Sequence, residues 1–208
     1  EFNPRSIYGL ISGAKGKGMT PSEYSATVDS YLGSVVLEVY KAYVGKMRKE
    51  NALDFDDILL KTRDILRLDS VLEHFHNTFQ YFCVDEYQDT NTIQYEIIQL
   101  LASKSKNLCV VGDDWQGIYS WRGANIQNIL NFKHDFPAAE VVKLEQNYRS
   151  TSNIINAANV VIKNNRTALD KRMWTEAEEG DKIEIHECSS EREEADKIGN
   201  FVEKNPAA

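Results

Sequence analysis

The sequence predicts an α/β fold in which a parallel sheet follows a helical segment. Three short apolar runs typical of strands, at residues 81–84, 108–111 and 141–144, alternate with segments of helical spacing. This alternation is typical of parallel strands joined by crossover helices. The first fifty residues show helical periodicity alone. The 208 residues, 42% of them hydrophobic, suffice for one large domain or two modest ones.

The expected N-terminal helices follow from capping residues and apolar spacing. Ser22 is expected to cap one long helix that ends in the charged residues 46–50. A second helix is expected to begin at the N-cap Asp54. The acidic pair Asp56 and Asp57 then lies in its first turn and is interpreted as capping rather than catalytic.

Further helices are expected after the first strand. Asn91 and Gln94 have the spacing of a capping box, which predicts a helix from about residue 91. Later helices are expected at about 124–134, at 151–164 and from Ser190, with a last strand-like run at 182–187.

Composition sets limits on the class of protein. The formal net charge of -8 argues against a nucleic-acid binder held by overall basicity, although it leaves room for a local site. No run approaches the roughly 18 apolar residues that span a bilayer, and the N-terminus lacks the profile of a secretory signal. A cytoplasmic protein without membrane partners is therefore expected. Cys83, Cys109 and Cys188 have no metal-ligand spacing and are interpreted as reduced core residues.

Two adjacent carboxylates, Asp85 and Glu86, stand directly after the first strand, in the run VDEYQDTN at residues 84–91. Carboxylates that follow a buried strand are desolvated and repel each other, so they usually serve a cation or a proton. This is the Walker B arrangement, in which one acid holds Mg²⁺ and its neighbour faces the water that attacks a nucleoside triphosphate. Alone, the pair could equally mark a strand end followed by a helix cap.

A second polar segment, GDDWQGIYSWRGA at residues 112–124, follows the second strand. Gln116 can hydrogen-bond a phosphate or a lytic water, and it is expected at the same sheet edge as the acidic pair. Tyr119 and Trp121 beside Arg122 form a platform of the kind on which single-stranded bases stack. The alternative is that both rings pack in the core.

A third segment, LEQNYRS at residues 144–150, lies between the third strand and a helix. Arg149 there is suited to neutralise charge on a transferred phosphoryl group, and Tyr148 can stack on a nucleobase. By itself, Arg149 could also be an ordinary surface or ion-pairing residue.

In order and spacing, these three segments resemble motifs II, III and IV of the UvrD/Rep (PcrA-like) family of superfamily 1 DNA helicases. The resemblance covers almost the whole chain, including NPRSIYGLISGAKG, ALDFDDIL and RMWTEAEEG. It implies a helical remnant of an inserted subdomain at 1–50. It also implies the C-terminal part of a first RecA-like P-loop NTPase motor at 51–148 and the start of a second motor at 149–208.

The resemblance implies a site for ATP and Mg²⁺. Asp85 would hold Mg²⁺, Glu86 would polarise the hydrolytic water, and Gln116 would sense the γ-phosphate. Tyr148 would stack on adenine, and Arg149 would act as the arginine finger from the edge of the second motor.

For DNA, the resemblance implies that Tyr119 and Trp121 stack on bases of the single strand, with Arg122 between the DNA and nucleotide sites. The implied function is ATP-driven 3′ to 5′ translocation on single-stranded DNA, with unwinding of partly duplex DNA in repair or replication.

The phosphate loop G-x-x-x-x-G-K-[ST] occurs nowhere in the sequence. The chain is therefore expected to be the middle of a larger helicase and to hydrolyse little ATP by itself. The rival hypothesis is a non-catalytic DNA-binding or interaction module that retains the helicase motifs as a scaffold.

Overall fold

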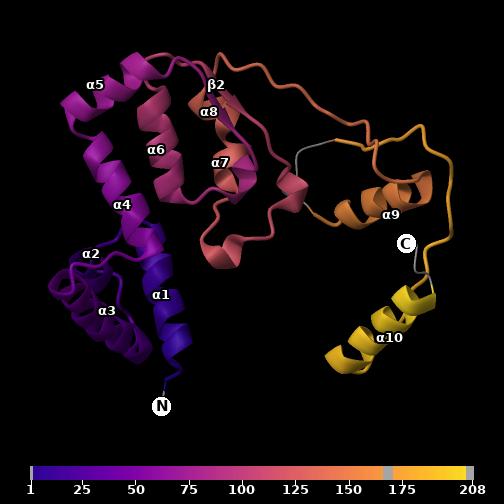
Figure 1. The fold of residues 1–208 in the computed structure, drawn as a ribbon, viewed down its shortest axis with the longest axis horizontal. Helices are drawn as coiled ribbons and strands as arrows, with labels where there is room; N and C mark the ends of the chain where they lie inside the picture. The colour runs from indigo at the N-terminus through magenta and orange to yellow at the C-terminus, as the bar shows by residue number, and fades with distance from the viewer. Residues whose placement is uncertain (1, 166–170, 205–208) are drawn as a thin grey trace. The chain divides into compact units, whose positions relative to one another are not determined.

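The computed structural model describes residues 2–165 and 171–204. The chain forms two compact units, Glu1–Val141 and Val142–Ala208. Figure 1 shows the first unit as a group of helices next to a short sheet, and the second as two helices linked by extended chain. Within the described residues, no helix is both long and apolar enough to cross a bilayer.

The first unit begins with three helices that share a small core. They are α1 (Pro4–Gly16), α2 (Pro21–Ser25) and α3 (Tyr31–Lys49). Apolar side chains of α1 and α3 meet in a buried cluster of Ile7, Ile11, Ala14, Val36 and Tyr40. The Tyr40 hydroxyl donates a hydrogen bond to the Met19 carbonyl at 2.8 Å, which ties α3 to the chain before α2.

The prediction of one long helix from Ser22 is wrong, because the chain has two better caps. The Thr20 hydroxyl and the Glu23 carboxylate form a capping box at the start of α2. Ser30 adopts an extended conformation and accepts a hydrogen bond from the Gly33 backbone N–H, which starts α3 afresh. Hydrophobic periodicity runs through both helices and does not reveal the break between them.

The next helices are α4 (Phe55–Leu66), α5 (Asp69–Thr78) and α6 (Thr92–Ala102). Helix α6 lies beside the sheet, and α4 and α5 pack against α6 (Figure 1). The predicted caps are confirmed: Asp54 with Asp57 forms a capping box on α4, and Asn91 with Gln94 forms one on α6. The sheet has two parallel strands, β1 (Phe82–Val84) and β2 (Leu108–Val110). Cys83 pairs with Cys109 in their register.

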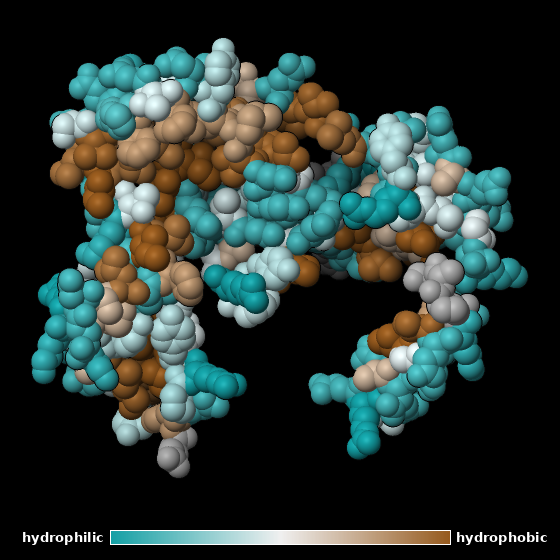
Figure 2. Space-filling view, viewed as in Figure 1, coloured by the Kyte–Doolittle hydropathy of each residue, from teal (hydrophilic) through white to brown (hydrophobic). Residues whose placement is uncertain are grey.

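The interpretation of the cysteines as core residues is wrong for two of them. Cys83 and Cys109 are exposed free thiols, and Cys188 is an intermediate one. Both exposed thiols lie on one face of β1 and β2, because side chains alternate along a strand. Solvent therefore reaches this face at both thiols. Figure 2 shows apolar side chains at the surface around α5 and α6.

Two predicted strands do not form. At residues 141–144 the chain is extended without a strand, and the side chains of Val142 and Leu144 are 71% and 83% exposed. Residues 182–187 likewise lie outside any strand, and Ile185 is exposed. A strand needs a neighbour for its backbone hydrogen bonds. In the described part of the chain, neither segment pairs with another strand, and the one isolated bridge nearby, Gln146 to Trp174, lies outside both.

The remaining helices match the expected positions in part. The helix predicted at 124–134 is two short ones, α7 (Gln127–Leu130) and α8 (Phe132–Asp135). In the second unit, α9 (Ser152–Ile162) and α10 (Glu191–Lys204) begin within one residue of the expected starts, although the Thr151 side chain makes no capping hydrogen bond to α9.

Candidate functional site

Directly after β1, the chain turns sharply at Asp85 and Glu86, a segment here called the acidic turn. Glu86 has φ 49° and ψ 43°, a left-handed conformation that costs a non-glycine residue about 1–2 kcal/mol. The Glu86 backbone N–H donates to Asp85 Oδ1 at 2.9 Å, so the Asp85 side chain supports the turn. Such strain persists where surrounding contacts fix the backbone, and it is concentrated at functional sites.

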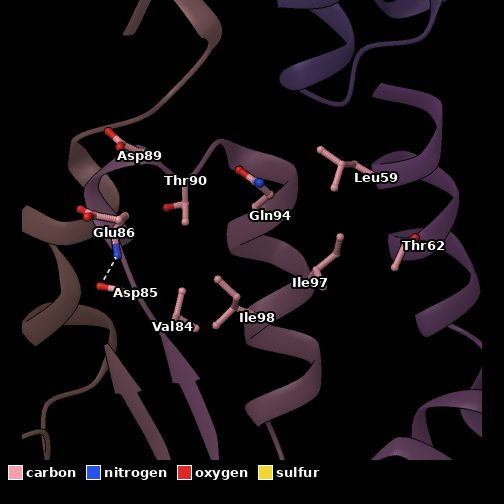
Figure 3. Close-up of a pocket in the computed structure, with 10 residues that line it drawn as sticks. All are labelled: Leu59, Thr62, Val84, Asp85, Glu86, Asp89, Thr90, Gln94, Ile97 and Ile98. Atoms are coloured by element: carbon pink, nitrogen blue, oxygen red, sulfur yellow. Dashed lines mark hydrogen bonds between the residues drawn. The ribbon is translucent and has the colours of Figure 1, made fainter. Parts of the chain in front are cut away.

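Both carboxylates are exposed, so the expectation that they are desolvated is wrong for the chain as described. The strand before them is only half-buried, and the acids face solvent at its end. The pKa of nearby Asp89 is raised by burial and by the charge of Glu86. Figure 3 shows Asp85, Glu86 and Asp89 projecting from the same side of the chain after β1.

A pocket of about 420 Å³ lies beside this turn. Its polar edge carries the three acids, and its apolar wall comes from α4 and α6, with Leu59, Ile97 and Ile98 (Figure 3). Carboxylate oxygens are ligands that Mg²⁺ prefers. Among the described residues, no three acidic, histidine or cysteine side chains are grouped closely enough to hold a metal ion. A magnesium ion here would need phosphate or water oxygens besides the protein's own.

A series of hydrogen bonds, here called the hydrogen-bonded link, joins the acidic turn to the segment after β2. The Gln88 side-chain amide donates to Glu86 Oε2 at 2.8 Å and accepts from the Asp113 backbone N–H at 2.9 Å. The Asp113 carboxylate then accepts from the Gln116 side-chain amide at 2.8 Å. The structure therefore links Glu86 and Gln116, two of the predicted site residues, through the Gln88 side chain and through the backbone and carboxylate of Asp113.

The loop that follows Gln116, here called the aromatic loop, presents Tyr119 and Trp121 to solvent. Trp121 is 72% exposed, and Tyr119 is exposed as well. The Arg122 guanidinium lies 4.5 Å from the Trp121 ring centroid and 5.4 Å from that of Tyr119. The alternative in which both rings pack in the core does not hold for this arrangement. An exposed, cation-supported pair of rings is available for stacking.

Tyr148 and Arg149 lie in the second unit, and both are exposed. The Asn147 side-chain carbonyl accepts hydrogen bonds from the backbone N–H groups of Arg149 and Ser150 at 2.9 and 2.8 Å. The Tyr148 hydroxyl donates to the Gln146 side chain at 2.7 Å. This turn leads into α9 and holds both side chains in solvent, where each is accessible to a ligand.

Sequence reasoning did not predict the burial of Gln88 and Lys15, which are among the buried polar residues of the described chain. Gln88 lies within the acidic motif, but nothing in its spacing signals burial. Lys15, 2% exposed at the end of α1, forms ion pairs of 2.7 Å with both Asp54 and Asp57. Hydrogen bonds and charge from its partners outweigh burial and raise the pKa of Lys15. A lysine after a glycine-rich helix end gives no hint of this long-range pairing.

Comparison with known proteins agrees with the motifs. The UvrD/REP helicase N-terminal domain family matches residues 1–137, and the UvrD-like helicase C-terminal domain family matches residues 142–207. The "ATP-dependent DNA helicase PcrA" of Staphylococcus epidermidis is 47% identical over 205 residues, which are 98% of this chain. The same-named protein of Staphylococcus aureus is 49% identical over 206 residues, or 99% of the chain.

The chain spans 28% of the length of each of these relatives. The N-terminal family match alone extends over more than half of the chain. It contains the acidic turn, the hydrogen-bonded link and the aromatic loop. This chain belongs to the UvrD/Rep helicase family.

Proposed function

We propose that this chain is part of an ATP-dependent DNA helicase that moves 3′ to 5′ along single-stranded DNA and unwinds duplexes during repair or replication. Residues 51–148 would belong to a first RecA-like motor and residues 149–208 to a second, with residues 1–50 as the remnant of an inserted subdomain. The helicase names of the relatives support this proposal.

The observation that carries the proposal is the hydrogen-bonded link between Glu86 and Gln116. Phosphoryl transfer depends on holding the attacking water and the γ-phosphate in position relative to each other, so a link between the residues assigned to them fits a nucleotide site. Here one buried glutamine and one aspartate connect them. A structural capping role for the acidic pair would not require this connection.

In the proposed reaction, Glu86 orients the attacking water and accepts its proton. Asp85 fits Mg²⁺ as one carboxylate ligand beside the phosphate oxygens, and the ion would neutralise charge on the phosphates. Gln116 detects the γ-phosphate. Tyr148 would stack on adenine, and Arg149 would stabilise the charge of the transferred group.

The DNA contact would lie on the aromatic loop. Tyr119 and Trp121 would stack on successive bases, with Arg122 between this surface and the nucleotide. The exposure of both rings supports this role, because base stacking needs a free ring face. Stacking in one nucleotide state and release in another would convert hydrolysis into steps.

The second candidate is a non-catalytic DNA-binding or interaction module. The absence of a phosphate loop from this sequence favours it for the 208 residues by themselves. The two hypotheses differ in what the full-length protein does with ATP.

The test is Glu86→Gln in the full-length protein. The amide retains the size of the side chain but cannot accept the proton, so DNA-stimulated ATP hydrolysis should be lost while ATP and DNA still bind. Glu73→Gln, at an exposed position of α5, is the matched control and should retain hydrolysis. Hydrolysis by the Glu86→Gln protein at the wild-type rate would refute the catalytic role. A wild-type protein without DNA-stimulated hydrolysis would favour the non-catalytic module.

A further inference from the structure

The side chain of Gln88 is the only part of the hydrogen-bonded link that is fully buried, with 1% of its surface exposed. Its amide nitrogen donates to the Glu86 carboxylate, and its carbonyl oxygen accepts from the Asp113 backbone N–H. Neither bond survives a flip of the amide, because the nitrogen would then face a donor and the oxygen would face a carboxylate. The Gln88 side chain is therefore held in one orientation by both partners.

Close packing around Gly112 holds this amide in place. A Cβ at position 112 would lie 2.7 Å from Gln88 Oε1, 2.9 Å from the Ile129 side chain and 3.2 Å from the Tyr87 backbone nitrogen. Only glycine leaves room for the amide between the two strand ends. A side chain at position 112 would therefore displace the Gln88 amide or its neighbours.

Asp113 connects Gln88 to the first residues of the aromatic loop. Its carboxylate accepts from the Trp115 backbone N–H at 3.0 Å and from the Gln116 side chain at 2.8 Å. The chain then runs within five residues to Tyr119 and Trp121. The first half of the aromatic loop is thus arranged around a residue whose backbone is bonded to Gln88.

The far end of the loop has a separate attachment to the same motif. The Asn125 backbone N–H and the buried Asn128 side chain donate to the Thr90 carbonyl at 2.9 and 3.1 Å, and Asn128 also donates to the Thr90 hydroxyl. This attachment does not involve Glu86. It anchors the loop without contact to the acid that would act on water.

We propose that Gln88 is a positioning residue that couples the nucleotide site to the aromatic loop. This inference rests on the proposed function. When Glu86 engages nucleotide and water, its carboxylate reorients, and the bond from Gln88 must follow. Because the amide is wedged and bonded at both ends, the change reaches Asp113 and the residues that lead to Tyr119 and Trp121.

The proposal is tested by the coupling between nucleotide and single-stranded DNA in the full-length protein. The dissociation constant for a fluorescent oligonucleotide is measured with and without Mg²⁺ and a non-hydrolysable ATP analogue. Coupled sites typically change each other's affinity by about 5–150-fold. Gln88→Met retains the volume and loses both hydrogen bonds, so its ratio of dissociation constants should fall below about twofold.

Two further variants separate positioning from folding. Gln88→Glu retains the acceptor for Asp113 but places a second carboxylate against Glu86, so it should lose coupling as well and serves if Gln88→Met fails to fold. Asn128→Leu removes the side-chain hydrogen bonds of the second attachment and should lower the melting temperature while the ratio stays within about twofold of the wild type.

Three results would overturn the inference. Gln88→Met could retain the wild-type ratio, Gln88→Glu could retain it, or Asn128→Leu could lose coupling as fully as the Gln88 variants do. The last result would mean that coupling is lost whenever a contact that holds the aromatic loop is removed, whether or not Gln88 is involved. A wild-type protein that shows no DNA-stimulated ATP hydrolysis contradicts the proposed function instead, and that control is measured first.

Discussion

Replacing Trp121 by alanine tests whether the exposed ring binds DNA or supports the fold. Base stacking on an aromatic side chain is worth about 1–3 kcal/mol per base. The Trp121→Ala change in the full-length protein should therefore weaken single-strand binding by about 5–150-fold, since 1.4 kcal/mol corresponds to tenfold in affinity.

The structure limits the cost of the same change to stability. A fully buried tryptophan typically loses about 3–5 kcal/mol on truncation to alanine, but the Trp121 side chain is mostly in solvent. About a quarter of that loss, roughly 1 kcal/mol, is expected from burial. Loss of the contact with the Arg122 guanidinium adds about 0.5–1 kcal/mol at an exposed site.

The assay combines fluorescence anisotropy with a single-stranded oligonucleotide and thermal unfolding of the same protein. Trp121→Phe should retain most of the affinity because it keeps a ring face. Ile118→Ala is the matched control, because Ile118 is an exposed apolar side chain of the same loop without a ring. Unchanged DNA affinity in Trp121→Ala, together with a large fall in melting temperature, would refute the stacking role.

Two other predictions address the ion pairs of Lys15 and the second unit. Lys15→Met should lower the free energy of unfolding by about 1.5–3 kcal/mol at pH 7, because it removes the charged hydrogen-bond partner of two half-buried carboxylates. Burial raises the pKa of Asp54, but the hydrogen bonds that it accepts, first among them the one from Lys15, together outweigh burial, so the pKa in the folded protein is lowered. The stabilisation from Asp54 is therefore complete above the pKa of the unfolded chain, and it is lost as pH falls through the pKa of the folded protein. Urea unfolding should show the gap between wild type and variant narrowing at acid pH, and a gap of equal size at pH 7 and pH 3 would contradict the ion-pair account. Arg149→Ala in the full-length protein should depress ATP turnover more than nucleotide affinity, because the charge of Arg149 matters most during transfer. Steady-state kinetics with a nucleotide-binding titration would show this, and turnover at the wild-type rate would contradict the assignment.

Local signals in the sequence were sufficient for the helix starts that depend on neighbouring residues. Asp54 with Asp57, and Asn91 with Gln94, cap their helices as predicted, because a capping box is complete within four residues. The parallel pairing of 82–84 with 108–110 also followed from the strand-helix-strand order. The prediction of one long helix from Ser22 was wrong for a local reason too, since Thr20 and Ser30 are the residues that cap the two helices there.

Long-range features were less accessible to the sequence. The apolar run at 141–144 has the composition of a strand, yet no strand forms there, because a strand depends on a partner elsewhere in the chain. Cys83 and Cys109 lie on strands as expected, but their exposure depends on what covers that face of the sheet. Periodicity identifies an element without specifying its neighbours.

The sequence alone determined the family, since three motifs occur in the order and spacing that the family has. Only the tertiary structure determined how those motifs are joined. Gln88 contacts Asp113 across 25 positions of sequence, and Lys15 reaches Asp54 across 39. Each contact exists because the fold buries a polar group where only a distant partner can satisfy it, and unpaired burial would be costly. Short-range chemistry is encoded in adjacent residues, whereas burial is a property of the assembled fold.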